Sequence, residues 1–221
     1  YAAQGGAGMI QIEASPVPLP VDPDLEERLE IYEALLLKWQ PKMNLVAPST
    51  LKAIRQRHIE DSLQVFDALP TAKIWADIGS GGGFPGLVTA MRLRAVPGGV
   101  VHLIESDHRK CAFLREVSRE TMSSAEIHRG RIEDILPTLP KLDAISARAL
   151  SSMAQLMEMT HQRLENGSIG VFLKGQDVAS ELTKTPIYSK ILFRFLQSRT
   201  DPQGVIVLAG LADLIKGGVG P

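Results

Sequence analysis

The chain has 221 residues, of which 44% are hydrophobic and 22% charged, so it has the composition of one globular domain with a modest extension and not of a disordered chain. Its single cysteine, Cys111, excludes a disulfide framework and a cysteine-based zinc site. Lysine plus arginine (24) nearly balance aspartate plus glutamate (25), and aromatic residues make up 5%, so nucleic-acid binding would need a local basic patch.

The chain is expected to open with a tail and a helix. Residues 1–21 carry no periodic apolar pattern, and we expect a flexible tail that is partly of cloning origin. Asp22 followed by Pro23 is typical of a helix start, a capping side chain before proline at the first helical position. Apolar residues then recur at spacings of three and four, which predicts an amphipathic helix to about Trp39.

A second helical region is predicted at 49–69 with Ser49 as its N-cap, so that residues 22–70 form a helical extension. From 71 to 211 short strand-like runs alternate with helical patterns, which predicts right-handed crossovers and a parallel sheet covered on both faces. Only a turn-rich segment separates the last two runs, which predicts an antiparallel hairpin at one edge. The predicted strands are 74–78, 100–104, 125–128, 143–147, 168–173, 190–196 and 204–210, the helices between them are 85–95, 108–121 and 150–165, and 212–221 is a predicted C-terminal tail.

A glycine-rich segment, DIGSGGGFPG (77–86), lies between the first predicted strand and the next helix. Glycines let the backbone approach a ligand closely at the carboxyl edge of a parallel sheet, where ligands of such folds bind. Glu105 ends the next predicted strand, and a carboxylate there can accept hydrogen bonds from both ribose hydroxyls of an adenosine. The segment therefore predicts a cofactor that contains adenosine.

Two cofactor classes compete for this segment. Gly81, Gly83 and Gly86 satisfy the dinucleotide fingerprint, which on its own is a weak signal. Asp77, two positions before Gly79, would repel a pyrophosphate but suits a cofactor that carries an ammonium and a sulfonium. We therefore favour S-adenosylmethionine and a methyltransferase over a dehydrogenase, and over a glycine turn used only for packing.

The glycine-rich segment 77–86 resembles that of a known protein family. Six other segments share the resemblance: NL (44–45) and RHIEDSL (57–63) upstream, and LIESDHRKCAFLREV, GRIED, AISARAL and FLKG downstream. The chain is similar over about residues 25–210 to the bacterial small-subunit ribosomal RNA guanine-N7 methyltransferases, also called the glucose-inhibited division protein B family. The resemblance implies a class I S-adenosylmethionine-dependent methyltransferase: an α/β, Rossmann-like, mostly parallel seven-stranded sheet with a helical N-terminal extension. It also implies methyl transfer to N7 of a guanine in 16S ribosomal RNA.

The resemblance further implies roles for single residues. Gly79 and Phe84 would contact the cofactor, and Arg148 would lie where the cofactor and the target base meet. The predicted cofactor-binding residues are Asp77, Gly79, Gly81, Phe84, Glu105, Ile132, Glu133 and Arg148, with Ile132 and Glu133 beside the adenine. The predicted catalytic residues are Arg148, His58, Asn44 and Lys174. Each has a plainer alternative. Arg148 could be a surface charge or the partner of a helix-end carbonyl, and His58 a helix-surface or capping residue. Asn44 could be a helix terminator and Lys174 an exposed strand end.

The expected chemistry needs few functional groups. N7 of guanine already carries a lone pair in the base plane, so catalysis requires positioning and charge stabilisation but no general base. We expect no metal among the catalytic groups, and Cys111, inside a helical pattern, is predicted to be a small buried residue. The family's basic residue before the last strand has no clear counterpart; the nearest, Arg199, is assigned no role.

Predicted partners follow from the local charge pattern. Lys38, Lys42, Lys52, Arg55, Arg57 and His58 form the candidate surface for 16S ribosomal RNA or the small ribosomal subunit, although Glu60 and Asp61 dilute it. We expect a cytoplasmic protein that does not bind membranes, because the sequence has no apolar run of about 20 residues and no secretory leader. We also expect a monomer. Two other functions stay open: methylation of another RNA or a small molecule, and a non-catalytic nucleotide- or RNA-binding module.

Overall fold

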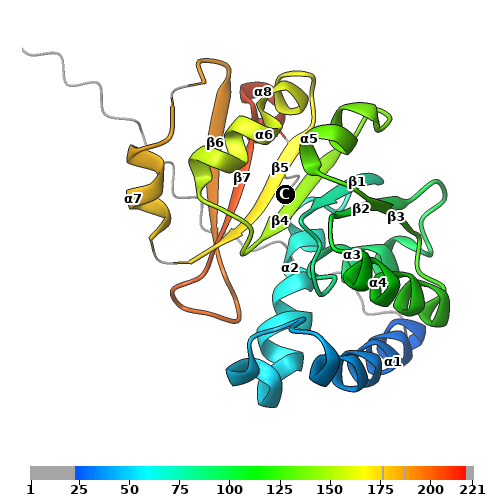
Figure 1. Cartoon of the computed structure of the whole chain (residues 1–221). Coiled ribbons are helices and arrows are strands. Elements are labelled where there is room, and N and C mark those ends of the chain that lie inside the picture. The colour runs from blue at the N-terminus through cyan, green and yellow to red at the C-terminus, as the bar shows by residue number, and fades with distance from the viewer. Residues whose placement is uncertain (1–22, 176, 187, 218–221) are drawn as a thin grey trace, which may run out of the picture.

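The computed structural model describes residues 23–175, 177–186 and 188–217; the predicted tail 1–21 and the capping residue Asp22 lie outside them. A seven-stranded sheet in the order β3-β2-β1-β4-β5-β7-β6 forms the centre of the molecule (Figure 1). The strands are β1 (Ile74–Ile78), β2 (Val100–Glu105), β3 (Ala125–Arg129), β4 (Ala144–Arg148), β5 (Ile169–Lys174), β6 (Ile191–Gln197) and β7 (Val205–Leu211). All seven predicted strands are therefore present, and none of their ends differs from its predicted position by more than one residue.

Strands β1 to β5 pair in parallel, whereas β7 is antiparallel to both β5 and β6. The predicted edge hairpin is thus confirmed, although its second strand, β7, is the one inserted beside β5. Because β1 to β5 run in the same direction, their carboxyl ends meet at one edge of the sheet. Three predicted site residues, Glu105, Arg148 and Lys174, are the last residues of β2, β4 and β5 and therefore lie along this edge.

Helices cover both faces of the sheet. One apolar core lies between the sheet and α1 (Pro23–Trp39), α2 (Asp61–Ala68), α3 (Gly86–Leu93), α4 (His108–Thr121) and α8 (Ala212–Gly217). A second core lies under α5 (Ile132–Ile135), α6 (Met153–Glu165) and α7 (Val178–Thr183). The caps explain two of the helix starts: the Asp107 carboxylate accepts from two backbone N–H groups of α4, and Ser152 forms a capping box with Gln155 on α6. None of the described helices is long and apolar enough to cross a membrane.

Two segments differ from the sequence-based expectation. The predicted helix 49–69 is divided into a 3-10 helix (Pro48–Ala53), a π-helix (Arg55–Glu60) and α2. Ser49 is not its cap, because Pro48 occupies the first helical turn and Ala47 precedes it. The stretch from 212, expected to be a tail, forms α8, which packs on β7 through the buried Ile215.

Candidate active site

A cavity of about 720 Å³ opens at the carboxyl edge of β1, β2 and β4. Seven of the eight predicted cofactor-binding residues line it: Gly79, Gly81, Phe84, Glu105, Ile132, Glu133 and Arg148. They come from the glycine loop after β1, from the ends of β2 and β4 and from α5, so the fold brings together residues that are up to 69 positions apart.

The glycine loop needs its glycines for backbone geometry. Gly79 has a φ of +67°, and a Cβ added there would lie 2.4 Å from Cδ1 of Leu150, which also lines the cavity. The Gly81 N–H donates to Oε2 of Glu105 at 2.9 Å, and the Asp107 N–H donates to Oε1 at 2.8 Å. Glu105 thus fixes the loop while it faces the cavity.

Asp77 lies behind the glycine loop and is not among the residues that line the cavity. Its side chain is buried, and Oδ1 accepts a hydrogen bond from Ser146 at 2.7 Å. Burial raises the pKa of Asp77 to about 6, against the opposing effects of hydrogen bonds from Ser146 and Ser80 and of the Arg148 charge. In this structure Asp77 lies where it can act on the cavity through its charge, and its contact with the cofactor stays a prediction.

Phe84 joins the cavity to the N-terminal helices. Its ring lies 4.9 Å from the Tyr32 ring and stacks on the His58 imidazole at 5.1 Å. The Tyr32 hydroxyl donates to the carbonyl of Gly82, so α1 also holds the glycine loop. The helical extension is therefore part of the site.

Arg148 lies at the boundary between this cavity and a second one of about 490 Å³. Its guanidinium lies 4.9 Å from the Phe84 ring centroid, donates to the Arg57 carbonyl at 3.2 Å and pairs with the Asp61 carboxylate at 3.7 Å. Leu45, Arg148 and Ala149 line both cavities. Ala149 has a φ of +50°, a strained conformation for a residue other than glycine and one that is common at functional sites.

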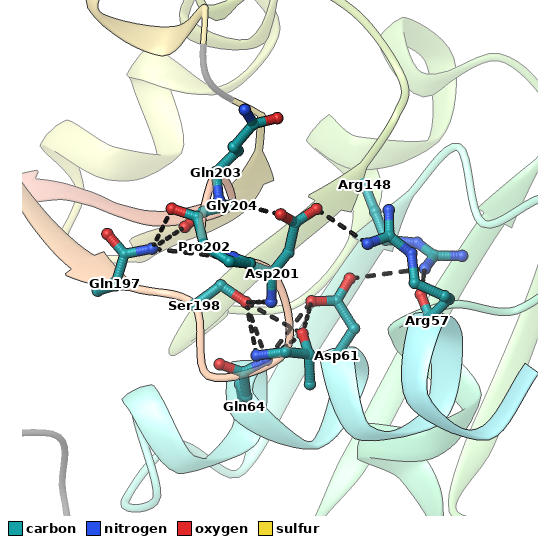
Figure 2. Close-up of polar contacts among 11 residues, drawn as sticks. Arg57, Asp61, Gln64, Arg148, Gln197, Ser198, Asp201, Pro202, Gln203 and Gly204 are labelled. Atoms are coloured by element: carbon teal, nitrogen blue, oxygen red, sulfur yellow. Dashed lines mark hydrogen bonds and ion pairs between the residues drawn. The ribbon is translucent and has the colours of Figure 1, made fainter. Parts of the chain in front are cut away.

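The second cavity is lined by charged groups of both signs. Figure 2 shows the carboxylates of Asp61 and Asp201 beside the guanidinium groups of Arg148 and Arg57. Asp61 also accepts from Thr200 at 3.0 Å, which ties the start of α2 to the turn between β6 and β7. The remaining charged lining residues are Lys174, Asp177 and Glu181.

Besides Arg148, two more of the predicted catalytic residues, His58 and Lys174, line the second cavity. His58 is buried, and its Nε2 is 2.7 Å from the Thr50 hydroxyl. Lys174 donates to the Ser151 carbonyl at 2.9 Å and pairs with Glu181 at 2.7 Å. Asn44 is exposed and is not a lining residue of either cavity, but it precedes Leu45, which lines both.

Burial lowers the pKa of His58 to about 4, with further lowering from the charges of Arg148 and Arg57. His58 is therefore a neutral ring at neutral pH. When unfolded, its pKa returns to about 6.5. The unfolded state then takes up the proton first as the pH falls, and the folded state loses stability between about pH 6.5 and 4.

His58→Gln should remove this pH dependence. The difference in unfolding free energy between wild type and variant, measured by urea denaturation, should shrink as the pH falls from 7.5 to 4.5. The raised pKa of Asp77 has the opposite effect, because it makes the folded state less stable as the pH rises. Both proteins contain Asp77, so its contribution cancels in the difference between them. Parallel stability curves over this range would show that His58 titrates normally.

The predicted RNA-facing cluster is partly neutralised by ion pairs. Lys38 pairs with Glu116, Arg55 with Glu26 and Arg57 with Asp201. Lys42 and Lys52 are exposed. Arg199, to which the sequence analysis assigned no role, pairs with Asp67. This ion pair joins the β6–β7 turn to α2.

Cys111 is buried in α4, where its Sγ lies 3.3 Å from the Glu105 carbonyl, and burial raises its thiol pKa. The prediction of a small buried residue is confirmed.

Sequence reasoning missed Asp61 and Asp201 as parts of the site. Asp61 belongs to the RHIEDSL motif, and that motif could have identified it as a site residue. Nothing in the sequence places the turn that carries Asp201 beside Arg57.

The family model for GidB, rRNA small subunit methyltransferase G, matches residues 25–198 of this chain. The chain belongs to this family. A ribosomal RNA small subunit methyltransferase G from Bradyrhizobium sp. (strain BTAi1) is 49% identical over 189 residues, 85% of both chains. One from Methylobacterium radiotolerans is 43% identical over 187 residues, 85% of this chain and 88% of that protein. The family expected from the motifs is confirmed.

Solved structures show the same fold at low identity. Cofactor-bound Rv0187 from MTB aligns with a TM-score of 0.59 at 17% identity and covers 91% of this chain and 99% of its own. A putative O-methyltransferase from Klebsiella pneumoniae aligns with a TM-score of 0.56 at 15% identity over 87% of this chain and 91% of its own. The predicted class I methyltransferase fold is confirmed.

Proposed function

We propose that this chain transfers a methyl group from S-adenosylmethionine to N7 of a guanine in 16S ribosomal RNA. The observation that carries the proposal is the pair of adjoining cavities at the carboxyl edge of the sheet, which share Leu45, Arg148 and Ala149. A methyl group passes directly from donor to acceptor only when both bind in adjoining pockets.

The first cavity fits an adenosine-containing methyl donor. Gly79 has a positive φ, a conformation that other residues rarely adopt, and as a glycine it presents bare backbone to the cavity. Glu105, at the end of β2, offers carboxylate oxygens to ribose hydroxyls, and Ile132 offers an apolar surface to adenine. Together with the cavity volume of about 720 Å³, these features accommodate the whole cofactor.

The second cavity fits a guanine base. Guanine presents acceptors at O6 and N7 and donors at N1 and N2. Arg148 is a donor and Asp61 an acceptor, and they lie next to each other at the boundary of the cavities. Arg148 would donate a hydrogen bond to O6, which lies beside the reacting N7. Asp61 would accept one from the N1–H, at the ring position next to the carbon that carries O6. Adenine carries an acceptor at N1, which the carboxylate would repel.

When bound, S-adenosylmethionine supplies a methyl group on a sulfonium, and its transfer to N7 moves positive charge onto the base. The residues of the chain need only hold N7 in line and accommodate that charge. Asp61 lines the second cavity, and a carboxylate there would stabilise both the developing cation and the more acidic N1–H of the bound base. His58 is a neutral ring here and adds no competing positive charge.

Loss of the Asp61 charge should weaken recognition of the base. Asp61→Asn keeps the size of the side chain but removes a charge-assisted hydrogen bond, so kcat/KM for RNA should fall by about tenfold to a hundredfold. Cofactor affinity should be unchanged, because Asp61 does not line the first cavity. Methylation kinetics on 16S RNA test this, with Asp213→Asn on the exposed side of α8 as the control. Equal kcat/KM for Asp61→Asn and wild type would exclude Asp61 from base recognition.

Neutralising part of the basic cluster should weaken RNA binding. Alanine at Lys52, Arg55 and Arg57 together removes three phosphate-binding charges, so KM for the ribosomal substrate should rise and its dependence on salt should flatten. The ion pairs of Arg55 and Arg57 limit the effect, since each arginine already has a partner. Initial rates at a series of salt concentrations measure both quantities.

A matched control replaces three exposed cations outside the cluster, Arg119, Lys141 and Lys190. If the control changes KM as much as the cluster variant does, the effect reflects total charge. If KM and its salt dependence stay at wild-type values in the cluster variant, the RNA contacts lie on another surface.

Two alternatives are separated by simple experiments. A methyltransferase for another RNA or a small molecule would leave 16S RNA unchanged, and a non-catalytic binding module would bind RNA or nucleotide without turnover. The modification state of 16S RNA from cells with and without this protein tests the proposal. We expect one guanine to lose its N7-methyl group when the protein is absent, and an unchanged methylation pattern would reject the function.

A further inference from the structure

Two histidines and a glutamate gather on one face of the sheet, away from both cavities. His102 lies on β2, and Glu126 and His128 lie on the neighbouring edge strand β3. The parallel register pairs His102 with Glu126 and Ile104 with His128. Side chains two positions apart on a strand share a face, so the register places the three functional groups together.

Their donor atoms form a compact triangle. Nδ1 of His102 lies 3.0 Å from Nε2 of His128 and 3.2 Å from Oε2 of Glu126, and the His128 and Glu126 atoms are 3.9 Å apart. A triangle with these sides has a circumscribed radius of about 2.0 Å, and zinc bonds to histidine nitrogen and carboxylate oxygen are about 2.0–2.2 Å long. One point near the plane of the three atoms is therefore at bonding distance from all of them.

We propose that His102, Glu126 and His128 bind a divalent transition-metal ion, with Zn²⁺ as the best match and water completing its coordination. Two imidazoles and one carboxylate are typical zinc ligands, whereas Mg²⁺ and Ca²⁺ prefer oxygen alone. Among the described residues, this is the one group of at least three such side chains whose ligand atoms all lie within 4.8 Å of one another.

The surroundings suit a site that is preformed and accessible. The His102 side chain is 6% exposed, so packing holds its ring in place. The Glu126 side chain is 62% exposed and that of His128 29%, so an ion can enter from solvent and keep water ligands. All three residues belong to regular strands, and the ion would bind with little rearrangement.

The role of this site would be structural. β3 is an edge strand that pairs only with β2, and its residues are exposed or half-buried. An ion between His102 and His128 would tie β3 to β2 close to Glu105 and to the loop that leads to Ile132 and Glu133. The metal would thus support the adenosine side of the first cavity without touching the reacting groups.

Cobalt binding tests the proposal independently of methyl transfer. Metal-free protein without a histidine tag is titrated with Co²⁺, and visible absorption reports low coordination number and nitrogen ligation. We expect one Co²⁺ per chain, displaced by Zn²⁺, and a melting temperature that rises with Zn²⁺ concentration and falls back on addition of EDTA. Glu126→Gln and His128→Gln should each weaken Co²⁺ binding at least about tenfold.

His161→Gln, which removes a histidine on α6, should bind Co²⁺ like wild type and is the matched control. Both cluster variants change half-buried or exposed side chains, so loss of binding in a protein that still melts cooperatively cannot be attributed to misfolding. Absence of a visible band at one equivalent of Co²⁺, or a His128→Gln variant that binds like wild type, would overturn the proposal. Neither result depends on whether the chain methylates 16S RNA.

Discussion

Arg148→Ala should lower the rate of methyl transfer by about 100- to 1000-fold, the loss typical of removing one preorganised charged donor from an active site. Arg148 is the side chain at which the two cavities meet, and it contacts Phe84, Asp61 and the Arg57 carbonyl at once. Its removal leaves the half-buried Asp61 without its cation and the base without a donor near O6. Single-turnover methylation of 16S RNA measures the loss.

Arg148→Lys separates geometry from charge. An ammonium keeps the charge but cannot form the planar fork that contacts Phe84 and two oxygen acceptors together, so we expect poor rescue. Thermal melts provide the folding control: the alanine variant should lose stability moderately, because Asp61 then lacks its partner. Near-wild-type turnover of Arg148→Ala would remove Arg148 from the site, and full rescue by lysine would show that charge alone matters.

Glu105→Gln should weaken cofactor binding by about tenfold to a hundredfold, because a charge-assisted hydrogen bond contributes about 1.5–3 kcal/mol. Glu105→Ala should be more damaging. The carboxylate also accepts from the Gly81 and Asp107 N–H groups, so alanine would leave two backbone donors unpaired and loosen the glycine loop. Calorimetry with S-adenosylhomocysteine, the demethylated product, measures the affinity of each variant.

Asp134 is an exposed carboxylate on α5 that does not line the cavity. Asp134→Asn is therefore the matched control and should bind the product like wild type. Melting temperatures distinguish a lost ligand contact from a disordered loop. The glutamine amide can accept from only one of the two backbone N–H groups, so Glu105→Gln should melt below wild type and Glu105→Ala lower still. Unchanged affinity in a folded Glu105→Gln would exclude the carboxylate from cofactor binding.

The fold was largely predictable because its signals are local. Glycine turns, proline and alternating apolar runs placed all seven strands and the helices after β1, β2 and β4. The residues that end parallel strands, Glu105, Arg148 and Lys174, necessarily share one edge of the sheet. For the same reason, most of the predicted cofactor-binding residues line one cavity.

The errors arise where tertiary contacts override local pattern. The helix expected at 49–69 contains a π-helical turn, and the Arg57 carbonyl within it accepts from Arg148. The local pattern around Asp77 did not show that its position within β1 buries the side chain against Ser146, so that it is not a lining residue of the cavity. The pairing of Asp201 with Arg57 joins residues 144 positions apart, and no local signal predicts it.

The most direct test of the central claim is identification of the methylated atom. Small ribosomal subunits and free 16S RNA that lack the modification are incubated with the protein and S-adenosylmethionine labelled in the methyl group, and the RNA is digested to nucleosides for mass spectrometry. The account predicts one labelled N7-methylguanosine per RNA with wild type and almost none with Arg148→Ala. Label on another atom or another base, or equal labelling by the two proteins, would contradict it.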